Sequence, residues 1–224
     1  MAINEVKTSS SGKIRTFFED RGYNPFVRIG GGIAIAAQKK LKMINVTTTK
    51  SQNIIAGYIP GLNVRLIAVY GPQENVPKED RQEFFDELST ELQSCEFAGN
   101  SPLVVGDLNS KLVYDDGIEA ISSNGEMLKE VIENHSLKVL NFDKCCKGKW
   151  TRVQTVKGVE VKSVLDYCLS SGEVVQRLES MIIDEEKLFC PFRVKKIQKV
   201  AHPQYSDHNA LLMVFKMSYK ETRK

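Results

Sequence analysis

Short apolar runs alternate with amphipathic stretches along this chain, and the runs predominate. Apolar residues that follow one another over about four to eight positions indicate buried strands. Six segments fit this description, at residues 30–40, 64–72, 101–109, 137–142, 161–171 and 208–217, and a seventh, more polar strand is predicted at 149–154. Gaps of hairpin length separate the later segments, which favours a fold rich in strands.

Two amphipathic stretches are predicted to be helices. The first, at residues 77–94, begins with Pro77 and an acid-rich turn, which are typical of a helix start. The second, at residues 124–136, has Asn124 as its expected cap. Apolar residues recur at helical spacing in both, namely Phe84, Phe85, Leu88 and Leu92 in the first and Met127, Leu128, Val131 and Ile132 in the second. We therefore expect two packed sheets with helices outside.

The chain of 224 residues is long enough to bury a sizeable core, and no linker rich in Pro, Gly or Ser divides it. We expect one domain over residues 1–217, followed by a charged tail at 218–224. The net charge of +3 permits nucleic-acid binding without requiring it. Five cysteines without a CxxC pair predict reduced thiols in an intracellular protein rather than disulfides or a zinc site. Neither a secretion signal nor a membrane-spanning run is apparent.

Polar side chains that could carry chemistry stand near the ends of the predicted strands. They are Glu5, Tyr70, Asp107, Asn109, Asp166, Ser206, Asp207 and His208. Carboxylates and an amide suit a hard divalent ion such as Mg²⁺. A histidine beside a carboxylate suits acid–base work or the stabilisation of developing charge. The alternation of side chains along a strand would place Asp107 and Asn109 on one face.

Each of these elements also has a plain structural interpretation. The tetrapeptide G-D-L-N is by itself more typical of a turn, in which Asp and Asn bond the local backbone. The S-D-H run could likewise be a cap or a turn. Asp166 lies within an apolar run, where a carboxylate is costly to bury without a partner. The combination of all three favours a functional site.

In chain order, the segments INEVKT, AVYGP, VVGDLNS, KWTRVQ, VLDYCLSS and YSDHNALLMVF resemble the endonuclease/exonuclease/phosphatase superfamily of metal-dependent phosphodiesterases. The resemblance spans about the whole chain. It implies a DNase I-like fold of class α/β, a four-layer α-β-β-α sandwich with two mixed β-sheets. The segments GKWTR, SLKVLNF and DEEKLFCPFR are most similar to the endonuclease domain of non-LTR retrotransposons.

The resemblance implies roles for the residues on the metal and water side of the site. Glu5 and Asp207 would lie at the metal, which is expected to be Mg²⁺, with Mn²⁺ as an alternative. Asp107 would activate or orient the attacking water. Asn109 and Tyr70 would contact the scissile phosphate.

The resemblance implies further roles on the opposite side of the phosphate. His208 would stabilise the charge that develops there, with Asp166 as its orienting carboxylate. Thr151 and Ser206 would supply hydrogen bonds at the substrate-binding site. The implied activity is metal-dependent phosphodiester hydrolysis, with the nicking of DNA by a retrotransposon-like element as the favoured form. The alternatives are a phosphoesterase for RNA, lipid or sugar-phosphate substrates and an inactive nucleic-acid-binding remnant.

One part of the superfamily pattern is missing from this sequence. Members normally begin with a strand that delivers an asparagine to the metal site, and nothing similar precedes Glu5. Asn4 would point to the opposite face of its strand. We therefore expect an N-terminally truncated form of the fold. The expected partners are the DNA phosphate backbone and a covalently linked reverse transcriptase domain in a longer parent, with no membrane, and the expected location is nuclear.

Overall fold

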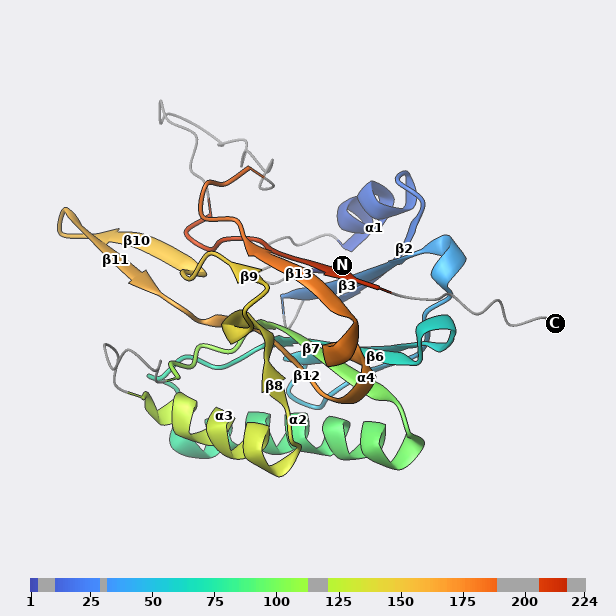
Figure 1. Ribbon diagram of the computed structural model, residues 1–224, viewed down its shortest axis with the longest axis horizontal. Coiled ribbons are helices and arrows are strands. Elements are labelled where there is room, and N and C mark those ends of the chain that lie inside the picture. The colour runs from blue at the N-terminus through green and yellow to red at the C-terminus, as the bar shows by residue number, and fades with distance from the viewer. Residues whose placement is uncertain (4–10, 29–31, 113–120, 189–205, 217–224) are drawn as a thin grey trace.

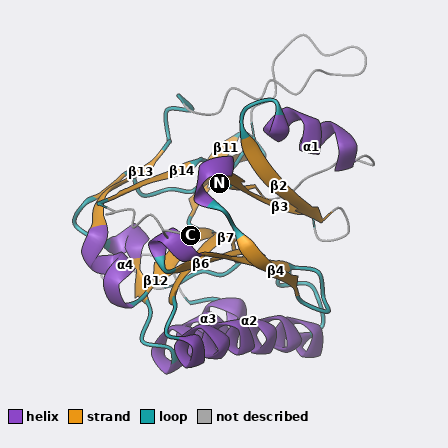
Figure 2. Ribbon diagram, turned by 90° about the vertical axis from the view of Figure 1, so that its right-hand side faces the viewer, coloured by secondary structure: helices purple, strands orange, loops and turns teal. Residues whose placement is uncertain are grey.

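The computed structural model describes residues 1–3, 11–28, 32–112, 121–188 and 206–216 (Figure 1). Two layers of β-structure pack against each other, and helices lie outside them (Figure 2). The central sheet has six strands in the order β4 (Ile44–Thr48), β5 (Ile54–Ile59), β6 (Val64–Tyr70), β7 (Ser101–Asp107), β12 (Asp166–Ser170) and β8 (Lys138–Val139). The β6–β7 pair is parallel and the other pairs are antiparallel, so this sheet is mixed.

Two helices, α2 (Lys78–Ala98) and α3 (Ser123–Asn134), cover the outer face of the six-stranded sheet (Figure 2). Their apolar faces are buried with one face of the sheet in a shared core, as the helical spacing predicts. The expected cap of α3 is wrong. Ser122 is the N-cap, because its side chain accepts a hydrogen bond from the amide of Gly125, whereas Asn124 is fully buried inside the first turn.

The second layer consists of two sheets of three strands each. One has the order β1 (Ala2–Ile3), β3 (Ile33–Gln38) and β2 (Tyr23–Arg28), and the other has the order β14 (Leu211–Phe215), β13 (Leu178–Ile183) and β9 (Cys146–Lys147). The second of these sheets is also mixed. No strand pairing joins β1 to β14 among the described residues.

The outermost layer on this side is α1 (Ser11–Glu19), which lies over β2 (Figure 2). A short helix, α4 (Gly172–Arg177), connects β12 to β13. A second core fills the space between the two layers of β-structure. The predicted α-β-β-α sandwich with mixed sheets is confirmed, with one of its β-layers present as two three-stranded sheets.

Two predicted strands differ in the structure. The segment at 161–171 is not one strand, because Val164 and Leu165 separate β11 (Val159–Ser163) from β12. The first part pairs with β10 (Arg152–Val156) in a hairpin that projects from the body, while the second part enters the central sheet (Figure 1). The segment at 137–142 has only the two-residue β8, and its remainder is a 3-10 turn.

Some expectations fall outside the described residues. They are the metal-binding role of Glu5 and the charged tail at 218–224. Among the helices that the structure describes, none combines the length and the apolar character needed to cross a membrane.

Candidate active site

Three of the expected site residues lie in one row across neighbouring strands. Asp107, at the end of β7, is in register with Tyr70 on β6 and with Asp166 on β12. Residues in register on adjacent strands point to the same face of a sheet. In this case the face is the inner one, where neighbouring side chains of the same strands pack between the two β-layers. The structure therefore brings these three side chains to one face of the central sheet.

The Asp107–Asn109 segment is a turn as well as part of the site. The backbone amide of Asn109 donates to Oδ1 of Asp107 over 2.8 Å, and Asn109 has a φ of 43°. The expected strand alternation does not extend to Asn109, because β7 ends at Asp107. Asn109 instead reaches the neighbouring loop, where its Nδ2 donates to the carbonyl oxygen of Gly71 over 2.8 Å.

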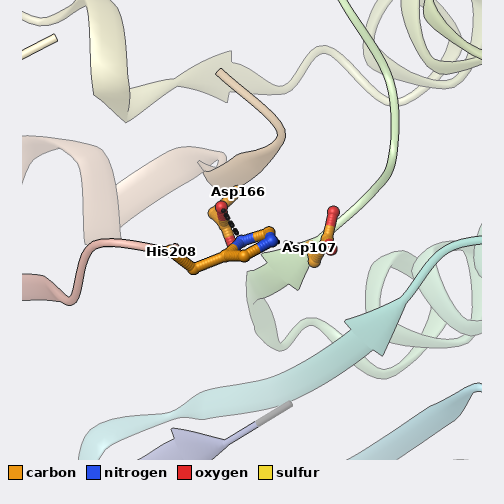
Figure 3. A group of neighbouring side chains, drawn as sticks. All are labelled: Asp107, Asp166 and His208. Carbon is orange, nitrogen blue, oxygen red and sulfur yellow. Dashed lines mark hydrogen bonds and ion pairs between the residues drawn. The ribbon is translucent and has the colours of Figure 1, made fainter. Parts of the chain in front are cut away.

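His208 lies between the two carboxylates, as Figure 3 shows. Its Nδ1 is 2.8 Å from Oδ2 of Asp166, and its Nε2 is 3.9 Å from Oδ2 of Asp107. Since a carboxylate is an acceptor, Nδ1 carries the proton of this short hydrogen bond. The distance from Nε2 to Asp107 exceeds a direct hydrogen bond. The two groups therefore face each other without a direct hydrogen bond.

The surroundings of His208 favour the charged imidazolium. Burial by itself lowers the pKa of His208. The hydrogen bond to Asp166 and the negative charges of Asp166, Asp107 and Asp207 raise the pKa by more than burial lowers it, so the pKa of His208 lies above its ordinary value. The Asp107 side chain is only 4% exposed and that of His208 20% exposed. This charge is therefore poorly screened by solvent and acts on whatever lies beside Nε2.

Asp207 is engaged differently from the expected metal ligand. Its Oδ2 accepts a hydrogen bond from Nε of Arg152 over 2.7 Å, and its side chain is 43% exposed. Partial burial raises the pKa of Asp207, but the hydrogen bond and charge of Arg152, together with the charge of His208, outweigh burial and lower it. In this structure the carboxylate therefore pairs with an arginine at the base of the β10–β11 hairpin.

Thr151 is placed to support the site from within rather than to contact a substrate. Its side chain is fully buried, and Oγ1 accepts hydrogen bonds from the amides of Leu165 and Asp166 over 2.9 and 3.0 Å. The structure thus gives Thr151 a supporting position behind the expected substrate-binding site. Ser206 is exposed, and its Oγ accepts the amide hydrogen of His208 over 3.1 Å. It fixes the start of the histidine loop.

Two further residues hold the site in place and were not identified from the sequence. Nζ of Lys187 donates to the carbonyl oxygens of Ser206 and His208 over 2.8 and 2.6 Å. Asn141 spans the backbone of β12, because its Nδ2 donates to the carbonyl oxygen of Asp166 and its Oδ1 accepts from the amide of Cys168. Both residues bond backbone groups that are far away in the sequence, so no local sequence pattern reveals these contacts.

Among the described residues, one cluster could hold a metal ion. Asp107, Asp166 and His208 each offer a ligand atom, and these atoms lie within 4.8 Å of one another. Carboxylate oxygens suit Mg²⁺, and a set that also contains an imidazole suits Mn²⁺. The donor set therefore fits a divalent cation, with Asp107 and Asp166 as its oxygen donors.

Comparison with known proteins supports the fold. No protein-family model matches the chain, and the search of curated proteins found no match. An AP endonuclease from Archaeoglobus fulgidus superposes with a TM-score of 0.71 at 15% identity, covering 96% of this chain and 88% of that one. The 3'-5' exonuclease NExo from Neisseria meningitidis gives a TM-score of 0.68 at 17% identity, with 95% and 86% of the two chains covered.

A retrotransposon protein is also among the structural neighbours. The endonuclease domain of TRAS1, a telomere-specific non-LTR retrotransposon, has a TM-score of 0.58 at 18% identity, covering 88% of this chain and 81% of that one. The chain thus has the DNase I-like fold of the endonuclease/exonuclease/phosphatase superfamily. The resemblance seen in the sequence is confirmed at the level of the fold.

Proposed function

We propose that this chain hydrolyses phosphodiester bonds in DNA with a divalent cation, and that it nicks the duplex. One observation carries the proposal. His208 is held by Asp166 at Nδ1 and turns Nε2 toward the buried Asp107, with 3.9 Å between them. A charged donor and a carboxylate acceptor therefore point at the same small volume.

Each of these side chains has a definite task in such a reaction. Asp107 accepts a hydrogen bond from the attacking water and takes its proton as the new oxygen–phosphorus bond forms. The phosphorus–oxygen bond on the opposite side breaks, and the leaving oxygen takes up a proton from solvent water. His208, protonated at both nitrogens, donates from Nε2 to a phosphoryl oxygen that gains negative charge. Asp166 keeps the ring oriented. A divalent cation at Asp107 would add positive charge beside the same phosphate.

Tyr70 and Asn109 are proposed to bind the phosphate from two neighbouring loops, one after β6 and the other after β7. Tyr70 is in register with Asp107 on the neighbouring strand, so the two side chains lie on the same face of the sheet. The amide of Asn109 uses one hydrogen on Gly71, and the second hydrogen on Nδ2 can serve the phosphate. Glu5 remains a proposed metal ligand. Asp207 is proposed to act through Arg152 instead.

A nicking assay tests this proposal. Supercoiled plasmid is incubated with the protein and Mg²⁺ or Mn²⁺, with and without EDTA, beside a small chromogenic phosphodiester. Relaxation of the plasmid that requires the cation is the expected result. Turnover of the small ester without plasmid relaxation would indicate that the substrate is a phosphoester other than DNA. Plasmid binding without cleavage would indicate an inactive nucleic-acid-binding protein.

We also propose a retrotransposon-like origin, with nuclear action and a linked reverse transcriptase in a longer parent. The support is the set of segments that resemble non-LTR endonucleases, together with the fold shared with the TRAS1 domain. Sequencing of the nicked ends tests the origin. Clustering of nicks at one preferred target sequence is expected, whereas cleavage only at abasic positions would favour a repair enzyme.

A further inference from the structure

The loops that carry Tyr70, Asp107 and Asn109 are joined to each other through their backbones. The amide of Gly71 donates to the carbonyl oxygen of Asp107 over 2.7 Å. A side chain at Gly71 would clash with the loop after Asp107, because an added Cβ would lie 2.5 Å from the carbonyl oxygen of Leu108. The two loops therefore form one tightly packed unit.

A single buried amide, that of Asn124 at the start of α3, bonds both loops. Its Nδ2 donates to the carbonyl oxygen of Pro72 over 2.8 Å and to that of Asn109 over 3.0 Å. The side chain is fully buried, so water does not compete for either bond. These two carbonyl groups belong to the two loops that also carry the phosphate-binding residues of the proposed mechanism.

The orientation of this amide is set by Arg81 on α2. A guanidinium NH of Arg81 donates to Oδ1 of Asn124 over 2.8 Å, which leaves Nδ2 to face the two carbonyl oxygens. Arg81 is itself 8% exposed, and its Nε donates to the carbonyl oxygen of Val76. The backbone amide of Asn124 donates to Glu74 over 2.8 Å. Asn124 is therefore bonded on every side.

The rest of the first turn of α3 lies equally close to the Asp107 loop. Ser122 and Lys111 exchange hydrogen bonds, in which each backbone amide donates to the other residue. An added Cβ at Gly125 would lie 2.0 Å from the carbonyl oxygen of Lys111. The helix start is thus in direct contact with the loop that begins at Asp107.

We infer that Asn124 is a positioning residue, which sets the spacing between the Tyr70 loop and the Asp107 loop through its two amide hydrogens. This inference rests on the proposed function. Its structural content, that loss of the two hydrogens loosens these loops, stands apart from any substrate. Misplacement of a reacting group by about 1 Å can cost about a hundredfold in rate.

The substitution Asn124→Asp tests the inference. It keeps the shape and the oxygen that faces Arg81, but it replaces the two donor hydrogens with an acceptor that repels both carbonyls. Ser123→Ala is the matched control, because Ser123 also accepts a hydrogen bond from Arg81 but, among the described residues, bonds neither loop. Glu74→Ala is a milder variant, since Glu74 is exposed and, within the described part of the chain, its side chain bonds only the backbone amide of Asn124.

Two readouts distinguish positioning from general damage. The first is amide hydrogen exchange at Gly71 and Asn109, which should quicken in Asn124→Asp while buried amides of β5 stay protected. The second is plasmid nicking, in which kcat should fall by between about tenfold and a hundredfold with KM changed by less than about threefold. Glu74→Ala should show the same pattern with a loss of about threefold, and Ser123→Ala should stay within about twofold of the wild type.

The outcomes separate this inference from the proposed function. Equal exchange at Gly71 and Asn109 in Asn124→Asp and Ser123→Ala would overturn the positioning role, whatever the activity. A wild-type protein that does not nick DNA would overturn the proposed function, and the exchange data would still decide the role of Asn124. Should Asn124→Asp fail to fold, unchanged exchange and activity in Glu74→Ala would overturn the inference.

Discussion

The two sides of the candidate active site are held in place by different kinds of contact. The Asp107 side, which comprises the loops at 70–74 and 107–111 and the start of α3, is fixed by hydrogen bonds from the buried side-chain amide of Asn124 to two backbone carbonyl groups, with the buried Arg81 behind this amide. The His208 side, which comprises the loop at 206–209, is fixed by charged and partly exposed side chains, namely Arg152 with Asp207 and Lys187 with backbone carbonyls. Buried neutral bonds are insensitive to salt, whereas exposed ion pairs are screened and contribute little. The difference indicates that the Asp107 side is the more rigid of the two and that the His208 side is the more sensitive to salt.

Among the changes that compare the two sides, the largest effect is expected from Asp166→Asn, which removes the charge that holds His208. We expect kcat for nicking to fall by about a hundredfold. The pKa of His208 is raised by Asp166, so activity that needs the imidazolium is lost as pH rises through that pKa, and the variant should lose it at lower pH. The same charge also stabilises the fold below the ordinary pKa of 6.5, and this contribution is lost as pH rises through the folded-state value. A pH–rate profile whose alkaline limb does not move would contradict the role of Asp166.

On the Asp107 side, Gly125→Ala should destabilise the protein. The added methyl group would lie 2.0 Å from the carbonyl oxygen of Lys111, and overpacking of this kind costs about 1–3 kcal/mol. Thermal or urea unfolding measures the loss. Glu126→Ala, an exposed change on the same turn of α3, is the control and should leave the free energy of unfolding within about 0.5 kcal/mol. Equal stability of the two variants would show that the Asp107 side is packed more loosely than the structure indicates.

On the His208 side, Lys187→Met should reduce activity without unfolding the protein. The loop loses the two hydrogen bonds to the carbonyl oxygens of Ser206 and His208, and we expect kcat to fall by about fivefold. Lys129→Met on α3 removes a lysine whose side chain is 61% exposed and serves as the control. The comparison fails if the two lysine variants nick DNA at the same rate.

The smallest expected effect is that of salt on local motion. Raising NaCl from about 50 to 500 mM should quicken amide exchange at His208 and Val153 by about two- to threefold, because screening weakens the Arg152–Asp207 pair. Exchange at Asn109 should not change, since its amide bonds Asp107 inside the buried side of the site. An equal response at all three amides would remove the distinction between the two sides.

The sequence predicted the residues of the site better than it predicted their supports. Asp107 and Asp166 were identifiable because each ends or interrupts an apolar run, where a carboxylate needs a reason to be present. His208 was identifiable from its motif. The layering of the fold followed from the same apolar runs. These signals are local, and a single sequence shows them.

The supporting contacts depend on distant parts of the chain. Asn124 bonds carbonyl groups that lie 52 and 15 residues away, and the backbone accepts such bonds from any donor in place. The Arg152–Asp207 pair forms over a separation of 55 residues, between the base of the β10–β11 hairpin and the loop of His208. The break at Val164 was hidden because the apolar pattern continues through it. These features depend on tertiary contacts and not on the local conformational preferences of the residues, so the sequence alone does not reveal them.

The central proposal for this protein is that Asp107 and its neighbours perform phosphodiester hydrolysis. Single-turnover nicking of supercoiled plasmid with Mg²⁺ by Asp107→Asn and by Asp86→Asn tests this claim most directly, since the second variant removes the same charge from an exposed position on α2. We predict that Asp107→Asn loses activity by about a thousandfold and that Asp86→Asn retains the wild-type rate. Equal rates in the two variants would place the activity elsewhere and contradict the account.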